Sequence, residues 1–323
     1  MNRISLALLT LCTGVALQAT AQSRLLPVLE ANPDARSAAM GNTLLGNTGQ
    51  MHIHTNPAAL TFGDTRFAAD VTTEMQPKTD AGRLMQYNFG AGWRFANRSA
   101  LLAGMRYQAG LTVPSVGTDG QPASVSPYEM AIDLGYSFAV VPEIAVYATA
   151  TYARSSAATS ANAWAFSVGA AYQKAFRLAA DMPTTLTAGA RLMDFGKSVK
   201  FNDTGIPYSL PTSVVVGGDW SVRLAPEHAL TYAVSCRHFT PKDAHETLFA
   251  NGLEYTYHGM LSARVGYQQA DKGSDALTFG AGGRFHGFRL DVTYHHAFAS
   301  YGINTLMVGV ATPSDATPLH AKG

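Results

Sequence analysis

Hydrophobic and polar positions alternate with a period of two along most of the chain from residue 65 onward. One face of the segment 288–295 is apolar and the other is polar: Phe288, Leu290, Val292 and Tyr294 against Arg289, Asp291, Thr293 and His295. The segments 99–107 and 260–269 show the same alternation. This pattern predicts β-strands with one apolar face, and helical spacing does not recur in the region.

Fourteen such segments, each about ten residues long, follow one another along the chain. They begin near residues 65, 84, 99, 128, 144, 162, 184, 211, 229, 247, 260, 275, 288 and 304. An even number of strands of this length is typical of a transmembrane β-barrel, in which each strand crosses the membrane once.

The connections between these segments alternate in length, as they do in a membrane barrel with short turns at one end and long loops at the other. The short connections are 96–98, 141–142, 225–226, 258–259 and 286–287. The longer ones are 74–83, 108–127, 196–210 and 239–246. The segment 175–183 fits poorly, because it falls on the short-turn side and is about nine residues long.

We therefore predict an all-β fold: a 14-stranded antiparallel transmembrane β-barrel over residues 65–311. Lipid cannot hydrogen-bond to backbone N–H and C=O groups, so a sheet that crosses a membrane has to close on itself. A soluble β-sandwich also has alternating strands. It is disfavoured because the apolar faces are uniform along the chain, while the opposite faces carry Gly, Thr and Arg rather than Lys and Glu.

The composition supports this interpretation. Only 14% of the residues are charged, against a usual value of about 25%, and the formal net charge is +1. A disordered chain needs low hydrophobicity and high net charge, and a nucleic-acid-binding protein carries a basic surface. Neither class fits, and no apolar run after the N-terminus is long enough for a membrane-spanning helix.

The N-terminus has the features of an export signal. Arg3 is followed by the apolar stretch 4–17 and by Ala19-Thr20-Ala21, which predicts a signal peptide over 1–21 with cleavage after Ala21. Residues 22–64 do not alternate and include a helix-compatible run at 34–40. We expect them to pack in or under the barrel, as a lumenal or periplasmic segment. Residues 312–323 are expected to form a polar tail.

Charged residues gather on the face opposite the apolar one. They are Arg106, Asp133, Arg191, Arg237, Glu254, Arg264, Arg284, Arg289 and Asp291. A charge facing lipid costs about 2–4 kcal/mol near the middle of the bilayer, so this face should line the lumen. The near balance of sign favours a mutually paired network. A path or pocket for a ligand with acidic groups is the alternative.

The sequence predicts no catalytic, metal or cofactor site. His295 and His296 point to opposite faces of a strand, and His52 and His54 have no third ligand at a useful spacing. Cys236 falls on the lipid-facing parity, where we expect it to be inert. The glycines at 280–283 lie within a strand and indicate room for lumenal side chains rather than a phosphate loop.

Several motifs resemble the PorV/PorQ family of FadL-like outer-membrane barrels from Bacteroidota. The stretch from Pro33 to Asn42, with Arg36, Met40 and Gly41, resembles the opening P-x-x-R-x-A-x-M-G of that family, and it is followed by Asn56-Pro57 before the first strand. Further similar stretches are 127–136, 210–218, 252–255 and 264–267. The resemblance extends over about residues 33–310.

This resemblance implies a fourteen-stranded barrel with an N-terminal segment in the lumen and a role in type IX protein secretion. The implied partners are outer-membrane lipid, the translocon barrel and the C-terminal signal domains of cargo proteins, which such a carrier binds and hands on. The implied location is the outer membrane, without cofactor and without nucleic acid. A lipopolysaccharide deacylase activity has been attributed within the group, but no residues here can be assigned to it. The alternative function is FadL-like transport of hydrophobic small molecules.

Overall fold

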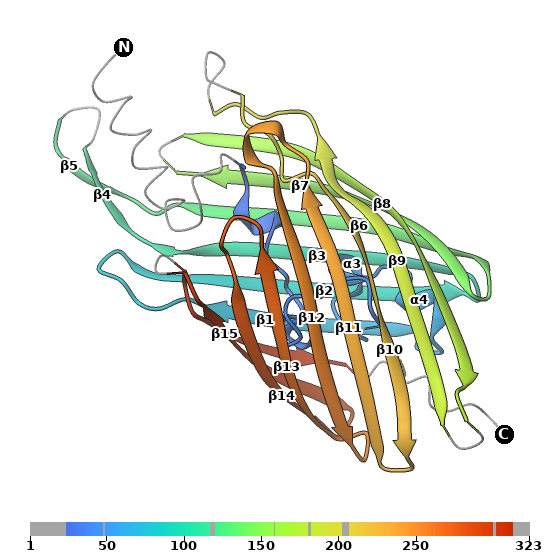
Figure 1. Cartoon of the computed structure of the whole chain (residues 1–323). Helices are drawn as coiled ribbons and strands as arrows, with labels where there is room; N and C mark the ends of the chain where they lie inside the picture. The colour runs from blue at the N-terminus through green and yellow to red at the C-terminus, as the bar shows by residue number, and fades with distance from the viewer. Residues whose placement is uncertain are drawn as a thin grey trace.

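Fourteen strands form a closed barrel in which all neighbouring strands are antiparallel (Figure 1). The computed structural model describes residues 24–47, 49–116, 120–157, 159–179, 182–201, 207–299 and 302–312. The predicted signal peptide lies outside the described residues, as does the predicted tail after Thr312. The fourteen-stranded antiparallel barrel predicted from the alternation is confirmed.

Each barrel strand pairs with the next one along the chain, and the first strand closes the barrel with the last. The strands are β1 Phe67–Met75, β2 Gly82–Ala96, β3 Ser99–Leu111, β6 Tyr128–Val141, β7 Ile144–Ser156, β8 Ser160–Arg177, β9 Pro183–Gly196, β10 Ser213–Ala225, β11 His228–Phe239, β12 Glu246–Tyr257, β13 Leu261–Ala270, β14 Ala276–Phe285, β15 Phe288–Ala297 and β16 Thr305–Ala311. In the closing pair, the register aligns Asp70 of β1 with Ala311 of β16.

Two connections differ from the prediction. The loop predicted over 108–127 contains a hairpin of β4 Val113–Val116 and β5 Pro122–Val125, which form a separate two-stranded sheet. The sequence did not predict these strands because they contain prolines, and proline lacks the N–H group that hydrogen-bonds to the neighbouring strand. The connection predicted over 175–183 is shorter, because β8 continues to Arg177 and pairs there with Pro183.

The outside of the barrel is apolar and the inside is polar. Leu134, Trp164 and Leu261 point outward and are 65%, 60% and 61% exposed. Their chain neighbours on the inward face include Asp133 and Ser262, of which Asp133 is buried and Ser262 is half-buried. The alternation in the sequence therefore separates an apolar exterior from a polar lumen, the reverse of a soluble protein.

A segment that we call the plug, residues 24–47 and 49–62, runs through the barrel. It holds four one-turn helices: η1 Pro27–Leu29, α2 Ala35–Ala38, α3 His52–Thr55 and α4 Ala59–Phe62. A fifth one-turn helix, η2 Lys242–Ala244, lies in the connection after β11. The helices α3 and α4 are seen inside the barrel in Figure 1. None of the helices among the described residues is long and apolar enough to cross a membrane.

The plug enters at the end with the long connections and leaves at the end with the short turns. The backbone N–H of Leu25 donates to the carbonyl of Ser209, in the connection between β9 and β10, at 3.2 Å. Leu60 packs against Ala68 and Ala100, which lie near the short turn between β2 and β3. The plug thus extends along the length of the lumen.

Most of the large hydrophobic core belongs to the plug rather than to the barrel wall. Among the largest fully buried side chains of the described residues, those of the plug are Leu26, Val28, Leu29, Met40, Leu45, Met51, Ile53, Asn56 and Leu60. The wall contributes small residues at many inward positions, for example Ala131, Ala153 and Ala165, which pack against the plug around Leu29. The plug therefore supplies the apolar volume that the wall lacks.

Candidate functional site in the plugged barrel interior

The helix α2 begins the part of the plug that carries the family-like motif. Asp34 is its N-cap, and its carboxylate accepts hydrogen bonds from the backbone N–H groups of Arg36 and Ser37 at 3.1 Å each. Such a cap satisfies N–H groups that have no partner within the helix. Gln50 also donates to this carboxylate. Burial raises the pKa of Asp34 above its usual value, although these hydrogen bonds oppose the rise.

Arg36 joins the plug to the barrel wall. Its Nε and Nη2 atoms donate to the carboxylate of Glu254 at 2.9 and 2.5 Å, and its Nη1 donates to the carbonyl of Asn47 at 2.6 Å. Burial alone would lower the pKa of Arg36, but the charge of Glu254 and its hydrogen bonds outweigh burial and raise it. A two-pronged arginine–carboxylate pair of this kind is strong and geometrically specific.

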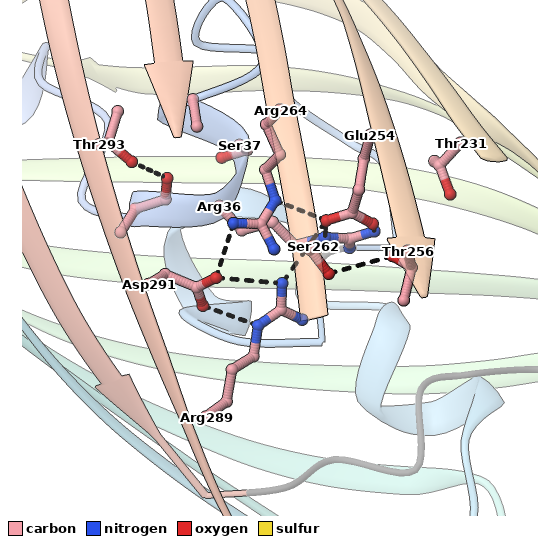
Figure 2. Close-up of polar contacts among 12 residues, drawn as sticks. Arg36, Ser37, Thr231, Glu254, Thr256, Ser262, Arg264, Arg289, Asp291 and Thr293 are labelled. Carbon is pink, nitrogen blue, oxygen red and sulfur yellow. Dashed lines mark hydrogen bonds and ion pairs between the residues drawn. The ribbon is translucent and has the colours of Figure 1, made fainter. Parts of the chain in front are cut away.

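Glu254 belongs to a cluster of five charged side chains, which we call the paired cluster (Figure 2). Its members are Arg36, Glu254, Arg264, Arg289 and Asp291. Arg264 Nε donates to Glu254 at 2.5 Å, and its Nη1 lies 2.7 Å from Asp291. Arg289 Nε donates to Asp291 at 2.7 Å, and its Nη2 lies 3.6 Å from Glu254. Every member lies within ion-pair distance of an oppositely charged partner, and the cluster as a whole sets three arginines against two carboxylates.

The remaining residues of the predicted lumenal network lie elsewhere. Arg106, Asp133, Arg191 and Arg237 belong to a second group, described below. Arg284 is half-buried and lies beside the paired cluster, opposite Arg289 in the register between β14 and β15. The structure therefore divides the predicted network into two groups at different places in the lumen.

Met40 and Gly41 of the motif pack against glycines of the wall. Gly252 on β12 and Gly266 on β13 have no room for a side chain, because a Cβ there would overlap the backbone of Met40 or Gly41. Gly41 itself has φ +75°, a conformation that favours glycine. Gly280 on β14 faces Ala39 in the same way, and Gly282 faces Arg264 and Asp291, so these two glycines provide room in the lumen.

The second half of the motif orders the far end of the plug. The side-chain amide of Asn56 donates to the carbonyls of Leu45 and Gly46 at 3.2 Å each, and its oxygen accepts from the N–H of Ala58 at 3.2 Å. Pro57, between them, is buried. Asn56 therefore links two distant parts of the plug and starts the turn into α4.

Side chains of the wall bind the irregular backbone of the plug. Thr72 donates to the carbonyl of Pro33 at 2.7 Å, and Thr278 donates to the carbonyl of Ala39 at 3.0 Å. Thr293 donates to the carbonyl of Ala35 in the same manner (Figure 2). A buried backbone group without a partner costs free energy comparable to a lost hydrogen bond. The polar inward face thus satisfies a segment that has little secondary structure of its own.

The plug also encloses a second charged group, which we call the cavity cluster: Arg106, Asp133, Arg191, Asp194 and Arg237. Arg106 donates to Asp133 at 2.8 Å, and Arg237 Nη2 lies 3.9 Å from Asp194 Oδ2. These side chains line a cavity of about 360 Å³ between the plug and the wall. The arrangement can bind polar or charged groups because it borders this cavity, whereas each arginine of the paired cluster lies within ion-pair distance of a carboxylate.

Several buried acids were missing from the sequence prediction. Asp70 accepts from the N–H of Met51 and Asp219 from the N–H of Asn47, each at 2.8 Å, and both lie on inward positions that strand parity alone could have found. Asp194 could not be found in this way. It has φ +54°, and β8 and β9 shift register nearby, so its side chain turns inward next to Met193, which is also buried.

The two histidines of the plug are buried and do not form a metal site with other side chains of the described residues. His52 and His54 are buried on α3, and burial lowers the pKa of His52 to about 4. Burial, together with Arg106 and Arg191, lowers the pKa of His54 to about 3, against the opposing charge of Asp133. Within the described residues, no three His, Cys, Asp or Glu side chains come together as a metal site.

On the wall, His295 follows the inward parity of Thr293, whereas the His296 ring stacks on Tyr294 of the outward face. Cys236 is half-buried and shares the outward face of β11 with Tyr232. These positions agree with the parity expected from the sequence.

Solved structures with the same barrel fold include transport proteins. The toluene transporter TodX of Pseudomonas putida matches over 91% of this chain and 100% of its own, with 15% identity and a TM-score of 0.61. A FadL homologue of Pseudomonas aeruginosa matches over 88% and 98%, with 12% identity and a TM-score of 0.53. At these identities the likeness concerns the fold alone. No curated protein matches the sequence.

The sequence itself matches a family model. That model describes the type IX secretion system protein PorV, and it matches residues 17–241, which include the plug and the wall from β1 to β11. PorV proteins and FadL-like barrels are outer-membrane proteins of secretion or transport. Because the match covers more than half of the chain, this protein belongs to the PorV family of the type IX secretion system.

Proposed function

We propose that this protein is an outer-membrane component of type IX secretion that binds the translocon barrel, the signal domains of cargo proteins, or both, as a carrier or shuttle. It acts by binding and catalyses no reaction. The observation that carries the proposal is the match to the PorV family over the plug and most of the wall.

The apolar exterior supports a location in the outer membrane. Side chains such as Leu134, Trp164 and Leu261 are more than half exposed, which would be costly in water and is favourable in lipid. The predicted signal peptide, cleaved after Ala21, supplies the route of export. In this proposal the long connections face outward and the short turns face the periplasm.

The plug in the lumen supports binding at the surface rather than conduction. The plug passes through the whole barrel, and the paired cluster fixes it to β12, β13 and β15. We propose that this cluster holds the plug in place. A barrel with a fixed plug has its partner-binding surfaces outside the lumen, on the long connections.

Three connections at the long-loop end are the proposed contact surface: 112–127 with the β4–β5 hairpin, 197–212 and 240–245. Thr240 donates its N–H to the carbonyl of Thr212 at 2.9 Å, so two of these connections touch. The hairpin extends beyond the barrel (Figure 1), and Val116 in it is 65% exposed. An exposed apolar residue on a projecting hairpin suits contact with another protein.

The test is a pull-down of the tagged protein from its own outer membrane in mild detergent, followed by mass spectrometry. We expect recovery of a large translocon barrel or of proteins that bear the type IX sorting domain. A variant with residues 112–127 replaced by a short Gly-Ser linker should still fold as a barrel and should recover less of these partners. Wild-type protein that elutes without such partners would contradict the proposal.

FadL-like transport of hydrophobic small molecules is the second candidate, favoured by the likeness to the TodX fold. It requires an apolar path through the lumen and release of the plug. The same purified sample distinguishes the two: bound lipid or fatty acid together with the absence of protein partners would favour transport. The buried charges of the paired cluster argue against an apolar path.

A further inference from the structure

The cavity between plug and wall is built as a site with charges of opposite sign at its two ends. It reaches from Arg191, in the middle of β9, to Gln108 and Gln268, which lie near the long-loop ends of β3 and β13 and are partly exposed. We call the part around Arg191 the floor and the part around Glu246, the first residue of β12, the mouth. A ligand could enter from the long-loop end.

The floor holds a buried positive charge that has no acidic partner. Arg191 is 5% exposed, and among the described residues no carboxylate lies within ion-pair distance of it. Its Nη1 donates to the carbonyls of Ile53 and His54 at 3.3 and 2.9 Å, and its Nη2 donates to Thr149 at 3.2 Å. Its Nε is buried without a hydrogen-bond partner. A buried, uncompensated charge is costly, so an anion here would be strongly favoured.

The neighbours of Arg191 increase this surplus. Arg106 and Arg237 bring two further positive charges to the floor, against Asp133 and Asp194. Arg106 Nε and Arg237 Nη2 are also buried without hydrogen-bond partners. Burial keeps His54 neutral. The floor therefore sets three arginines against two carboxylates. Three of its N–H groups and two of its carboxylate oxygens, Asp133 Oδ2 and Asp194 Oδ2, are buried without hydrogen-bond partners.

The mouth of the cavity carries more negative than positive charge. Arg24 pairs with Glu30 and with Glu246, each at 2.9 Å, so two carboxylates share one guanidinium. The Phe239 ring joins the two regions, because it lies 3.9 Å from the Arg24 guanidinium and 4.3 Å from that of Arg237. The cavity is thus positive at its floor and negative at its mouth.

We propose that this cavity binds a small zwitterion, with its anionic group at Arg191, Arg106 and Arg237 and its cationic group toward Glu30 and Glu246. The volume of about 360 Å³ accommodates a molecule of the size of an amino acid. The anionic group of such a ligand compensates the surplus positive charge of the floor. Its cationic group keeps the ligand from adding net negative charge beside the acidic mouth. The assignment rests on the lumen alone and is independent of the proposed role in secretion.

The test measures binding of three matched probes to the full-length detergent-solubilised protein by isothermal titration calorimetry: 6-aminohexanoate, hexanoate and hexylamine. They have the same chain and differ only in their charged ends. We expect 6-aminohexanoate to bind at least tenfold more tightly than hexanoate, and hexylamine to bind most weakly. No binding of 6-aminohexanoate, or equal binding of hexanoate or hexylamine, would overturn the proposal even without any variant.

The variant Arg191→Met should weaken binding of 6-aminohexanoate at least tenfold, and Arg191→Lys, which keeps the charge, should retain part of the affinity. Arg98→Met at the exposed β2–β3 turn is the control and should bind as the wild type does. Unchanged affinity in a folded Arg191→Met protein would also overturn the proposal. Partner recovery in the pull-down described above is scored separately, so failure of one proposal is not mistaken for failure of the other.

Discussion

Replacing Glu254 with glutamine tests whether the paired cluster holds the plug. Glu254→Gln keeps the shape of the side chain but leaves Arg36, Arg264 and Arg289 with Asp291 as their remaining acidic partner in the cluster. Removing one partner from a buried ion pair costs about 3–5 kcal/mol, because a buried charge is left uncompensated. Since Arg36 belongs to the plug and the other members to the wall, most of this cost should appear as easier release of the plug.

The assay is hydrogen exchange of the plug amides in detergent-solubilised protein, read by mass spectrometry. A loss of about 3–5 kcal/mol corresponds to exchange faster by roughly two to three and a half powers of ten. The control is Glu227→Gln, since Glu227 pairs with His258 in an exposed position, where a salt bridge contributes about 0–1 kcal/mol. Plug amides that exchange in Glu254→Gln as slowly as in the wild type would refute the role of the cluster.

Three further outcomes are expected. Burial lowers the pKa of His52 to about 4, below about 6.5 when exposed, so the stability that neutral His52 contributes to the plug is fully present above pH 6.5 and falls with decreasing pH. The share of His52 in plug release should rise about tenfold, or 1.4 kcal/mol, from pH 7.5 to 5.5, with a similar share from His54. His52→Gln should abolish the His52 share in the same exchange assay. Gly266→Ala should destabilise the protein by about 1–3 kcal/mol in thermal denaturation, because the added methyl group overlaps the plug. The control Gly283→Ala, where the methyl group meets open space, should leave the stability unchanged. Equal unfolding midpoints of the two variants would contradict the packing argument. Leu134→Arg should make the free energy of folding into lipid vesicles less favourable by about 2–4 kcal/mol. The control Val116→Arg in the hairpin, where the side chain is equally exposed at 65%, should leave it unchanged. Equal folding free energies of the two variants would argue against a lipid-facing wall.

The wall could be predicted because its physics is local. A strand places successive side chains on opposite faces, so one stretch such as 288–295 already states which face is apolar and which is polar. Strand starts at 99, 128, 144 and 288 agree with the structure. The β4–β5 hairpin escaped prediction because short strands that contain proline look like a loop in sequence.

The plug was recognised as an exception to the alternation, but its path was not predictable. Its helices are single turns with too few residues to show a periodic pattern. Only α2 was anticipated, because its capping residue Asp34 begins the helix-compatible run at 34–40. What holds the plug is long-range: Arg36 meets Glu254 across more than two hundred residues of sequence. No local pattern contains that pairing.

The sequence by itself determined the barrel, the number of its strands and the inward parity of most of the buried charges, because each follows from alternation along a strand. Only the tertiary structure decided which charges meet: it separated Glu254 and its partners from the cavity cluster and brought Asp194 inward through a local distortion of β9. The physical reason is that parity fixes the face of a side chain, whereas the partner across the lumen depends on register, on barrel closure and on the path of the plug.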